Sequence, residues 1–380
     1  MHGTSQVTGK RKILMVLSGP VFEISPWMRQ KFEAMSARFE GTAFTSMPEP
    51  LELQVASITV KAVKVSRKTR LLGNLKYYAF ALRTAYALRK AGNAPELITS
   101  YDPLKTGLLA SLIKAITGAK FICEVNGVYH APKNYLDEGW LGARVKLFLY
   151  PIIMRYVLAR ADGIKIQYAS QIDPFKPVLR NPVIRIFFNQ VSFEKMKFIE
   201  ERKEVLFVGF PFRRKGVDIL IEAFKRVAPK FPEWKLKILG WFPDMTELNA
   251  AMDGHPQIYH HPPVYNHEMP DHIGRCAFLV LPSRSEAGGR VLLESMAASK
   301  PRLGADVDGI HKLIDDGVDG LLFKPEDVSD CAAKLEMLMA DDAMRARMGA
   351  AGSERVRKDF NSERYRELLF SFYEEVLERP

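Results

Sequence analysis

The stretch "AFLVLPSRSEAGGRVLLESMA" (residues 277–297) decides the fold. Its apolar run of strand type ends at Pro282, and a helix-like pattern of apolar residues begins at Arg290. Between them stand Glu286 and the adjacent Gly288 and Gly289. A strand, a glycine-bearing loop and a helix in this order predict a βα unit whose helix N-terminus faces the loop.

Outward from this unit, strand-like and helix-like stretches alternate along the chain, which is typical of parallel sheets covered by helices. We therefore predict an α/β protein of two Rossmann-like domains facing a cleft, with ligands outside the carboxyl ends of the strands. The predicted strands are 12–18, 56–65, 96–101, 120–125, 163–169, 204–210, 236–241, 276–283 and 320–323. The predicted helices are 27–39, 72–92, 106–118, 143–161, 217–230, 289–298, 331–340 and 362–379.

The same pattern suggests the domain boundaries. The first domain is expected over residues 1–192, a polar linker over 193–204 and the second domain over 205–360. The last segment, 361–380, is a candidate to pack back on the first domain.

The glycines and the two acids of the opening stretch suggest a phosphate-binding site. A helix N-terminus presents free N–H groups, so Gly288, Gly289 and Arg290 could hold a phosphate. Glu286 and Glu294 could then accept hydrogen bonds from hydroxyl groups on either side of a diphosphate. The alternative is a solvated Glu294 beside an ordinary glycine turn.

A second stretch, "FVGFPFRRKGVDILIEAF" (residues 207–224), points in the same direction. Arg213, Arg214 and Lys215 follow a strand and precede a helix, an arrangement that suits an anion. The alternative is a basic surface loop without a ligand.

With these two motifs the chain resembles the retaining glycosyltransferases of the GT-B type, known as group 1 or family four. The resemblance is strong from Val205 to Phe360 and weak before Ala159. It implies that Glu286 contacts the donor sugar, that Glu294 binds the ribose, and that Lys215 neutralises the leaving diphosphate without a metal. Further donor contacts are expected from Arg213, Arg214, Gly288, Gly289, Arg290 and Gly19.

Two positions depart from the family pattern. Phe210 stands where relatives carry an arginine, and Arg213 or Arg214 could substitute for it. Asn126 stands where many relatives carry a histidine; we place it among the catalytic residues, although an amide cannot act as a base.

The expected activity is transfer of a sugar from a UDP- or GDP-linked donor to a lipid-linked or glycan acceptor, in surface polysaccharide or glycolipid synthesis. Two alternatives stay open. One is a catalytically silent partner subunit, and the other is a nucleotide-sugar epimerase of the same fold.

We expect neither a cofactor nor a metal. The sequence from Asp306 to Asp308 resembles a metal-binding motif, but an aspartate at this place also suits a helix N-cap. The three cysteines are far apart in the sequence, which favours neither disulfides nor a zinc site.

Charge is distributed unevenly. Residues 1–200 hold 29 Lys+Arg and 14 Asp+Glu, whereas residues 201–380 hold 26 and 30. The segment 61–90 contains many cations and no acid, so we predict a cytoplasmic protein that associates with the anionic inner face of a membrane. A solvated basic face is the alternative, and no motif supports nucleic-acid binding.

Overall fold

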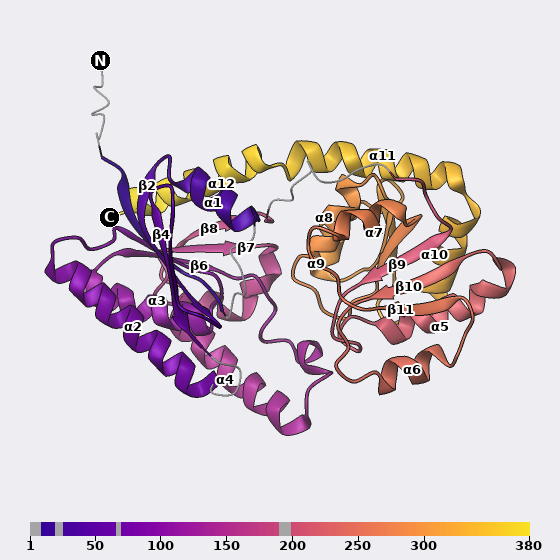
Figure 1. Ribbon diagram of the computed structural model, residues 1–380, viewed down its shortest axis with the longest axis horizontal. Coiled ribbons are helices and arrows are strands. Elements are labelled where there is room, and N and C mark those ends of the chain that lie inside the picture. The colour runs from indigo at the N-terminus through magenta and orange to yellow at the C-terminus, as the bar shows by residue number, and fades with distance from the viewer. Residues whose placement is uncertain (1–8, 20–25, 66–69, 190–198) are drawn as a thin grey trace, which may run out of the picture. The chain divides into compact units, whose positions relative to one another are not determined.

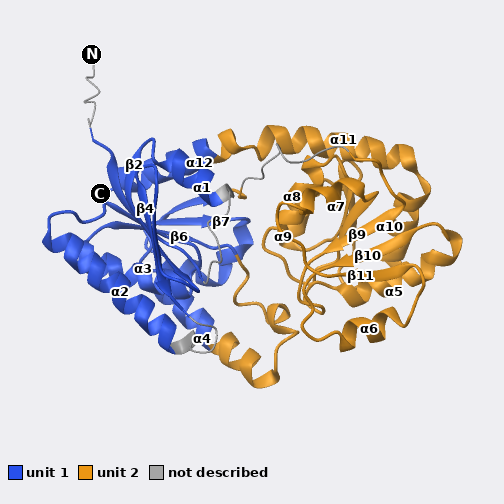
Figure 2. Ribbon diagram, in the orientation of Figure 1, with its two compact units in different colours: residues 1–126, 149–186, 366–380 blue, residues 127–148, 187–365 orange. Residues whose placement is uncertain are grey.

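The computed structural model describes residues 9–19, 26–65, 70–189 and 199–380 (Figure 1). Part of the predicted linker and two of the predicted basic residues, Arg67 and Lys68, lie outside these ranges. The chain forms two compact units (Figure 2). Unit 1 comprises residues 1–126, 149–186 and 366–380, and unit 2 comprises 127–148 and 187–365. Residues 127–148, which fall inside the expected first domain, thus cluster with unit 2.

Unit 1 is built on an eight-stranded sheet in the order β3-β4-β2-β1-β5-β6-β7-β8. All its neighbouring strands are parallel except β3 and β4. Its strands are β1 (Arg11–Val16), β2 (Phe39–Met47), β3 (Leu51–Val55), β4 (Ile58–Lys64), β5 (Leu97–Ser100), β6 (Lys120–Glu124), β7 (Gly163–Ile166) and β8 (Val183–Ile186). Its helices are α1 (Pro26–Met35), α2 (Arg70–Lys90), α3 (Lys105–Thr117) and the 3₁₀ segment η3 (Ala169–Val178). Helix α4 (Trp140–Leu158) begins in residues of unit 2 and ends in unit 1.

Unit 2 contains a fully parallel six-stranded sheet in the order β11-β10-β9-β12-β13-β14. Its strands are β9 (Glu204–Val208), β10 (Lys235–Leu239), β11 (Ile258–His261), β12 (Phe278–Leu281), β13 (Arg302–Ala305) and β14 (Gly320–Phe323). Its helices are α5 (Val217–Val227), α6 (Thr246–Met252), α7 (Met269–Arg275), α8 (Arg290–Ala297), α9 (Asp308–His311), α10 (Val328–Ala340) and α11 (Asp342–Asp359). The 3₁₀ turns η2 (Pro132–Tyr135) and η4 (Ala228–Lys230) complete it. The predicted α/β class with two Rossmann-like domains is confirmed.

The last helix, α12 (Ser362–Glu378), supplies unit 1 with residues from the far end of the chain. The ring of Phe370 stacks on Phe39 with 6.4 Å between centroids, and Tyr373 packs edge-on against the same ring at 6.0 Å. Glu374 forms an ion pair with Arg38. Aromatic burial is the main contribution of these contacts, because the ion pair is exposed and such pairs contribute at most about 1 kcal/mol.

One local prediction is wrong. The helix expected over residues 27–39 ends at Met35, and β2 begins at Phe39. Phe39, Ala43 and Phe44 are buried in the sheet, so tertiary burial determines the structure of a stretch whose local pattern did not suggest a strand.

Candidate donor site in unit 2

The strand order of unit 2 reverses beside its central strand. The chain runs outward from β9 through β10 to β11, and then returns to the other side of β9 with β12. In open parallel sheets this reversal opens a crevice at the carboxyl ends of the two strands. The loop bearing Lys215 follows β9 and the loop bearing Glu286 follows β12, so the topology brings the two predicted motifs together.

Lys215 and Glu286 form a direct ion pair. Their side chains are only 13% and 11% exposed. The hydroxyl of Ser283 donates to Glu286 Oε2 at 3.4 Å, and the backbone N–H of Ala287 donates to Oε1 at 3.2 Å. The structure therefore places two of the predicted catalytic residues in one polar site.

The charge state of Glu286 follows from these neighbours. Burial alone would raise the pKa of its carboxyl, but the charge and hydrogen bond of Lys215 outweigh this effect and hold the pKa below its ordinary value. The charge of Arg214 and the backbone N–H of Gly289 act in the same direction. Glu286 is thus an ionised acceptor that suits a sugar hydroxyl.

Two glycines allow the loops to approach this closely. Gly216 has φ +68°, and a Cβ there would lie 2.0 Å from the carbonyl oxygen of Pro282. A Cβ at Gly309, in α9, would lie 2.2 Å from the carbonyl oxygen of Glu286. Gly309 is not among the predicted site residues. The sequence offers one signal for it, a glycine directly after Asp308 in the segment that follows β13.

Helix α8 carries the second acid. The side chain of Glu294 is 17% exposed, and burial raises the pKa of its carboxyl although Arg290 opposes this effect. Arg290 Nε donates to Glu294 Oε1 at 2.9 Å. The alternative of a solvated Glu294 does not fit this burial. Gly288 and Gly289 immediately precede the helix, with Gly289 at φ +32°.

The two arginines of the β9 loop differ in their surroundings. Arg213 is exposed and its guanidinium binds Glu247 at 2.8 Å. Arg214 donates to the carbonyl of Phe210 at 3.2 Å, and its charge acts on Glu286. Of the two, Arg214 is therefore better placed to stand in for the arginine that Phe210 replaces.

Arg284 is a further residue of the site that the sequence did not single out. Its guanidinium binds both carboxylate oxygens of Asp218 at 2.8 Å and also donates to the carbonyl oxygen of Arg213 at 2.5 Å. Its backbone N–H donates to the carbonyl of Arg214 at 2.9 Å. Arg284 thus fixes the carbonyl side of the loop that carries Lys215.

Two predicted site residues, Asn126 and Gly19, lie in unit 1. Asn126 donates through Nδ2 to the carbonyl of Tyr101 at 2.8 Å and to Glu124 Oε2 at 3.3 Å. Its buried Oδ1 accepts no hydrogen bond from the residues that the structure describes. Gly19 follows β1, where a Cβ would lie 2.1 Å from the hydroxyl of Ser46.

A buried charge cluster fixes this amide. Glu124 lies between Lys31 and Lys165, at 3.3 and 3.5 Å. Burial would raise the pKa of the Glu124 carboxyl, but the two lysines and Asn126 lower it to about 2. An ionised Glu124 keeps Nδ2 of Asn126 turned toward it, which leaves Oδ1 as the atom able to accept a hydrogen bond from a ligand.

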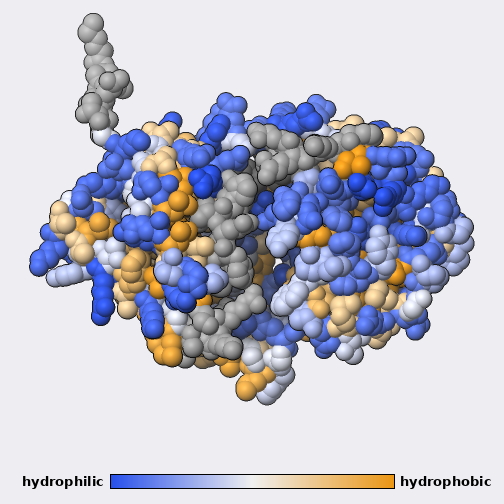
Figure 3. Space-filling view, in the orientation of Figure 1, coloured by the Kyte–Doolittle hydropathy of each residue, from blue (hydrophilic) through white to orange (hydrophobic). Residues whose placement is uncertain are grey.

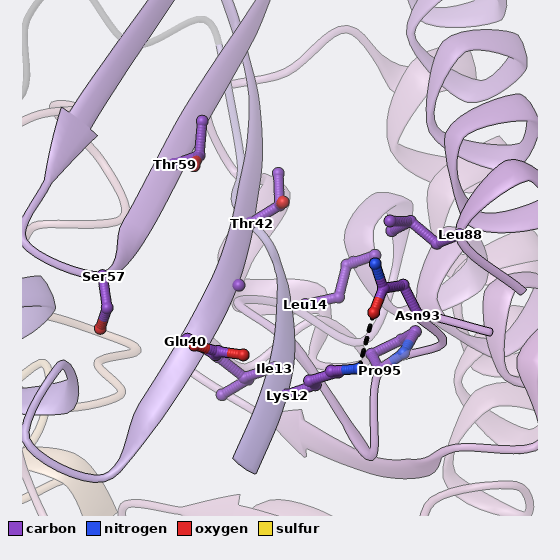
Figure 4. A pocket seen from close by; sticks show the side chains of 11 residues that line it. Lys12, Ile13, Leu14, Glu40, Thr42, Ser57, Thr59, Leu88, Asn93 and Pro95 are labelled. Carbon is purple, nitrogen blue, oxygen red and sulfur yellow. Dashed lines mark hydrogen bonds between the residues drawn. The ribbon is translucent and has the colours of Figure 1, made fainter. Parts of the chain in front are cut away.

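Unit 1 also contains a pocket of about 310 Å³ (Figure 4). Residues at the beginnings of β1, β2 and β4 line it, together with the end of α2, so it lies at the amino-terminal edge of the sheet. In Figure 4, Lys12 reaches Asn93, with 2.7 Å between Nζ and Oδ1. The pocket contains none of the predicted site residues; the two of them that lie in unit 1, Gly19 and Asn126, follow the carboxyl ends of β1 and β6, at the opposite edge of this sheet.

Among the described residues, no group of His, Cys, Asp and Glu side chains is arranged to hold a metal ion. Asp306, from the metal-like motif, pairs with His311 at 2.7 Å. Asp308 is the first residue of helix α9, whose N-cap is Val307, so the expected aspartate N-cap is wrong. Among all the residues that the structure describes, no helix combines the length and the apolar character needed to cross a bilayer.

Sequence comparison finds a family match in the second half of the chain. Residues 189–355 match the family model "Glycosyl transferases group 1". An uncharacterised glycosyltransferase of Methanocaldococcus jannaschii is 32% identical over 46% of this chain and 49% of its own length. A sulfoquinovosyl transferase of Arabidopsis thaliana is 31% identical over 49% of this chain and 35% of its own. The chain therefore aligns with about half of these relatives or less.

Structural comparison extends the likeness to the whole fold. A sucrose-phosphate synthase of Thermosynechococcus elongatus has a TM-score of 0.77 at 17% identity, covering 97% of this chain and 99% of its own. The HepE protein of Anabaena, solved with UDP and glucose, has a TM-score of 0.72 at 14% identity, covering 96% and 100%. At these identities the matches show the fold, which is that of the GT-B glycosyltransferases.

Proposed function

We propose, from the match of residues 189–355 to the group 1 glycosyl transferases, that the protein moves a sugar from a nucleotide-sugar donor to an acceptor hydroxyl. The observation that carries the proposal is the buried Lys215–Glu286 pair at the strand reversal of unit 2. A fixed cation beside a carboxylate suits a ligand that is anionic at its diphosphate and rich in hydroxyls at its sugar.

In the proposed reaction the bond between the sugar and the diphosphate breaks, and negative charge develops on the departing phosphate. Lys215, assisted by Arg214, stabilises that charge. Glu286 accepts hydrogen bonds from the donor sugar, and Glu294 accepts them from the ribose. We infer retention of the anomeric configuration from the family resemblance, with UDP or GDP as the leaving group.

The acceptor side is proposed to be unit 1, where Asn126 Oδ1 is oriented to accept a hydrogen bond from a hydroxyl group. The acceptor we propose is a lipid-linked sugar or glycan. Helix α2 buries one face and exposes the other to solvent. On the exposed face Leu72, Leu75 and Tyr86 are each more than 60% exposed. Exposed cations share that side, namely Lys76, Arg83, Arg89 and Lys90.

Helix α4 adds apolar side chains of its own. Leu141, Phe148 and Ile152 are 67%, 69% and 52% exposed, and Trp140 is 70% exposed beneath the guanidinium of Arg144. Apolar side chains lie among hydrophilic ones over the region of α2 (Figure 3). Apolar side chains mixed with cations fit an anionic bilayer surface, so we propose peripheral association with a membrane.

The donor proposal is tested by nucleotide binding and turnover. UDP and GDP binding to the full chain is measured by calorimetry, and release of nucleoside diphosphate from UDP- and GDP-sugars is measured by coupled assay. Lys215→Met should weaken diphosphate binding and lower turnover about 10²- to 10³-fold. Lys230→Met removes a lysine of the same unit that pairs with Glu336 at 2.8 Å, and it should change neither.

The outcomes separate the competing functions. Nucleotide binding without turnover on any donor, in the presence of many acceptors, would favour the silent partner subunit. Isomerised nucleotide-sugar without release of diphosphate would favour the epimerase. Absence of any nucleotide binding would remove the donor site itself.

A further inference from the structure

The segment 127–148 interrupts unit 1 in sequence but belongs to unit 2 by its contacts. It leaves unit 1 after Asn126, forms the turn η2, and re-enters unit 1 within helix α4. It contacts the loop of Lys215.

Asp137 makes the principal contact. Its Oδ1 accepts the backbone N–H of Arg213 at 2.6 Å, and its Oδ2 accepts the backbone N–H of Arg214 at 2.8 Å. One carboxylate thus satisfies two successive donors of a loop of hydrogen-bonded turns that precedes helix α5. Hydrogen bonds to an ionised acceptor are stronger than neutral ones.

The segment that presents Asp137 is itself ordered by internal bonds. The buried Tyr135 donates through its hydroxyl to the carbonyl of Tyr129 at 2.6 Å. The backbone N–H of Asn134 donates to the carbonyl of Ala131 at 3.1 Å, and the backbone N–H of Glu138 donates to the carbonyl of Tyr135 at 3.1 Å. A second tie to the rest of unit 2 joins Lys133 and Glu326 at 2.5 Å. Asp137 is therefore held at the end of a structured turn rather than on a free loop.

The Lys215 loop is consequently fixed from two sides. Asp137 binds the N–H groups of Arg213 and Arg214, while Arg284 binds the carbonyl groups of the same two residues. Lys215 is the next residue, and its ammonium group reaches Glu286. The position of that ammonium group depends on the backbone that these contacts hold.

We propose that Asp137 is a positioning residue of the donor site, which sets the Lys215 loop in the shape that binds a nucleoside diphosphate. The inference rests on the proposed donor site. The competing idea is that the carboxylate occupies the place of a donor phosphate and inhibits binding. A carboxylate in the place of a phosphate would bind the cations of the site. Lys215 instead pairs with Glu286, and Arg213 pairs with Glu247.

The test compares Asp137→Ala with Glu138→Ala in the full chain. The control removes the adjacent exposed carboxylate, whose partner Lys146 lies within the segment. Affinities for UDP and GDP are measured together with those for uridine and guanosine. Asp137→Ala should weaken diphosphate binding about 10-fold and leave nucleoside binding unchanged, whereas Glu138→Ala should change neither. Asp137→Asn, which keeps one carbonyl acceptor, should recover part of the loss.

Hydrogen exchange of the Arg213 and Arg214 amides gives a second readout that needs no ligand. Both amides should be protected in the wild-type protein and lose protection in Asp137→Ala. Equal loss for diphosphate and nucleoside, unchanged affinity, or tighter diphosphate binding would each overturn the inference. If the wild-type protein binds no nucleotide, the proposed function falls. Asp137 then has no donor site to position, and the inference falls with it. The exchange data show separately whether Asp137 holds the loop.

Discussion

At the scale of single residues, the Lys215–Glu286 pair has consequences for stability as well as for binding. A carboxylate buried beside a lysine remains ionised because the lysine offsets the cost of burial. Removing either partner leaves the other charge buried without compensation. The pair therefore links the state of the donor site to the folding free energy of unit 2.

This link predicts a pH dependence. The pKa of Glu286 is lower in the folded protein than its ordinary value of 4.5, so its ionised form contributes stability above that value. The contribution is lost as pH falls from 4.5 through the lower folded pKa. The difference in melting temperature between wild type and Glu286→Gln should therefore be constant from pH 6 to 8 and shrink below pH 4.5.

Thermal unfolding of both proteins across this range checks the prediction. Glu222→Gln is the control, since its carboxylate is exposed and pairs with Arg226 four residues later. Such pairs contribute under about 0.5 kcal/mol. A difference for Glu286→Gln that stays the same down to pH 3 would contradict the proposed charge state.

At the scale of elements, the sequence predicted the residues of the candidate donor site better than the residues that hold their loops in position. Lys215 and Glu286 follow apolar strands that carry glycine loops, so local pattern and the rule for parallel sheets suffice to bring them together. Asp137 could not be found in this way, because it reaches Arg213 across 76 positions and from a turn with no strand of its own. Gly309 was missed for the same reason, since its role is a close approach to the backbone of another loop.

The packing of Gly216 against Pro282, directly after β12, yields a prediction with a matched control. Gly216 and Gly254 have φ +68° and +64°, so alanine at either position meets a similar backbone strain, about 1–2 kcal/mol. Around Gly254 nothing lies within 4 Å of an added Cβ, whereas at Gly216 the carbonyl oxygen of Pro282 lies 2.0 Å away. Gly216→Ala should therefore displace the Lys215 loop and weaken nucleotide binding at least 10-fold, while Gly254→Ala should only lower stability.

Calorimetric titration with UDP and GDP, with chemical denaturation of each variant, separates the two effects. Equal affinity in both variants would mean that the contact between Gly216 and Pro282 does not determine the donor site.

At the scale of the whole molecule, charge and exposed apolar side chains predict salt-dependent membrane binding. Each Lys or Arg close to an anionic bilayer contributes about 1 kcal/mol. The full chain should sediment with vesicles that contain anionic lipid at low salt, and less so at high salt. Lys76→Glu with Arg83→Glu, both on the exposed side of α2, should lower vesicle binding more than 10-fold.

The control replaces Lys203 and Lys230 with glutamate. Both are exposed lysines of unit 2, and they pair with Glu233 and Glu336. That variant should bind vesicles like the wild type. Binding that is independent of anionic lipid at low salt would show that the basic side of α2 is merely solvated.

The return of α12 to unit 1 also has a consequence for how the protein is made. Unit 1 is assembled from three separate stretches, and the stretch Arg366–Pro380 is synthesised after every residue of unit 2. Unit 2 has all of its residues once Tyr365 has been synthesised. During translation unit 2 can thus complete its folding first, while Phe39 stays uncovered until Phe370 and Tyr373 are synthesised. A nascent chain halted before residue 366 would expose that aromatic surface to chaperones.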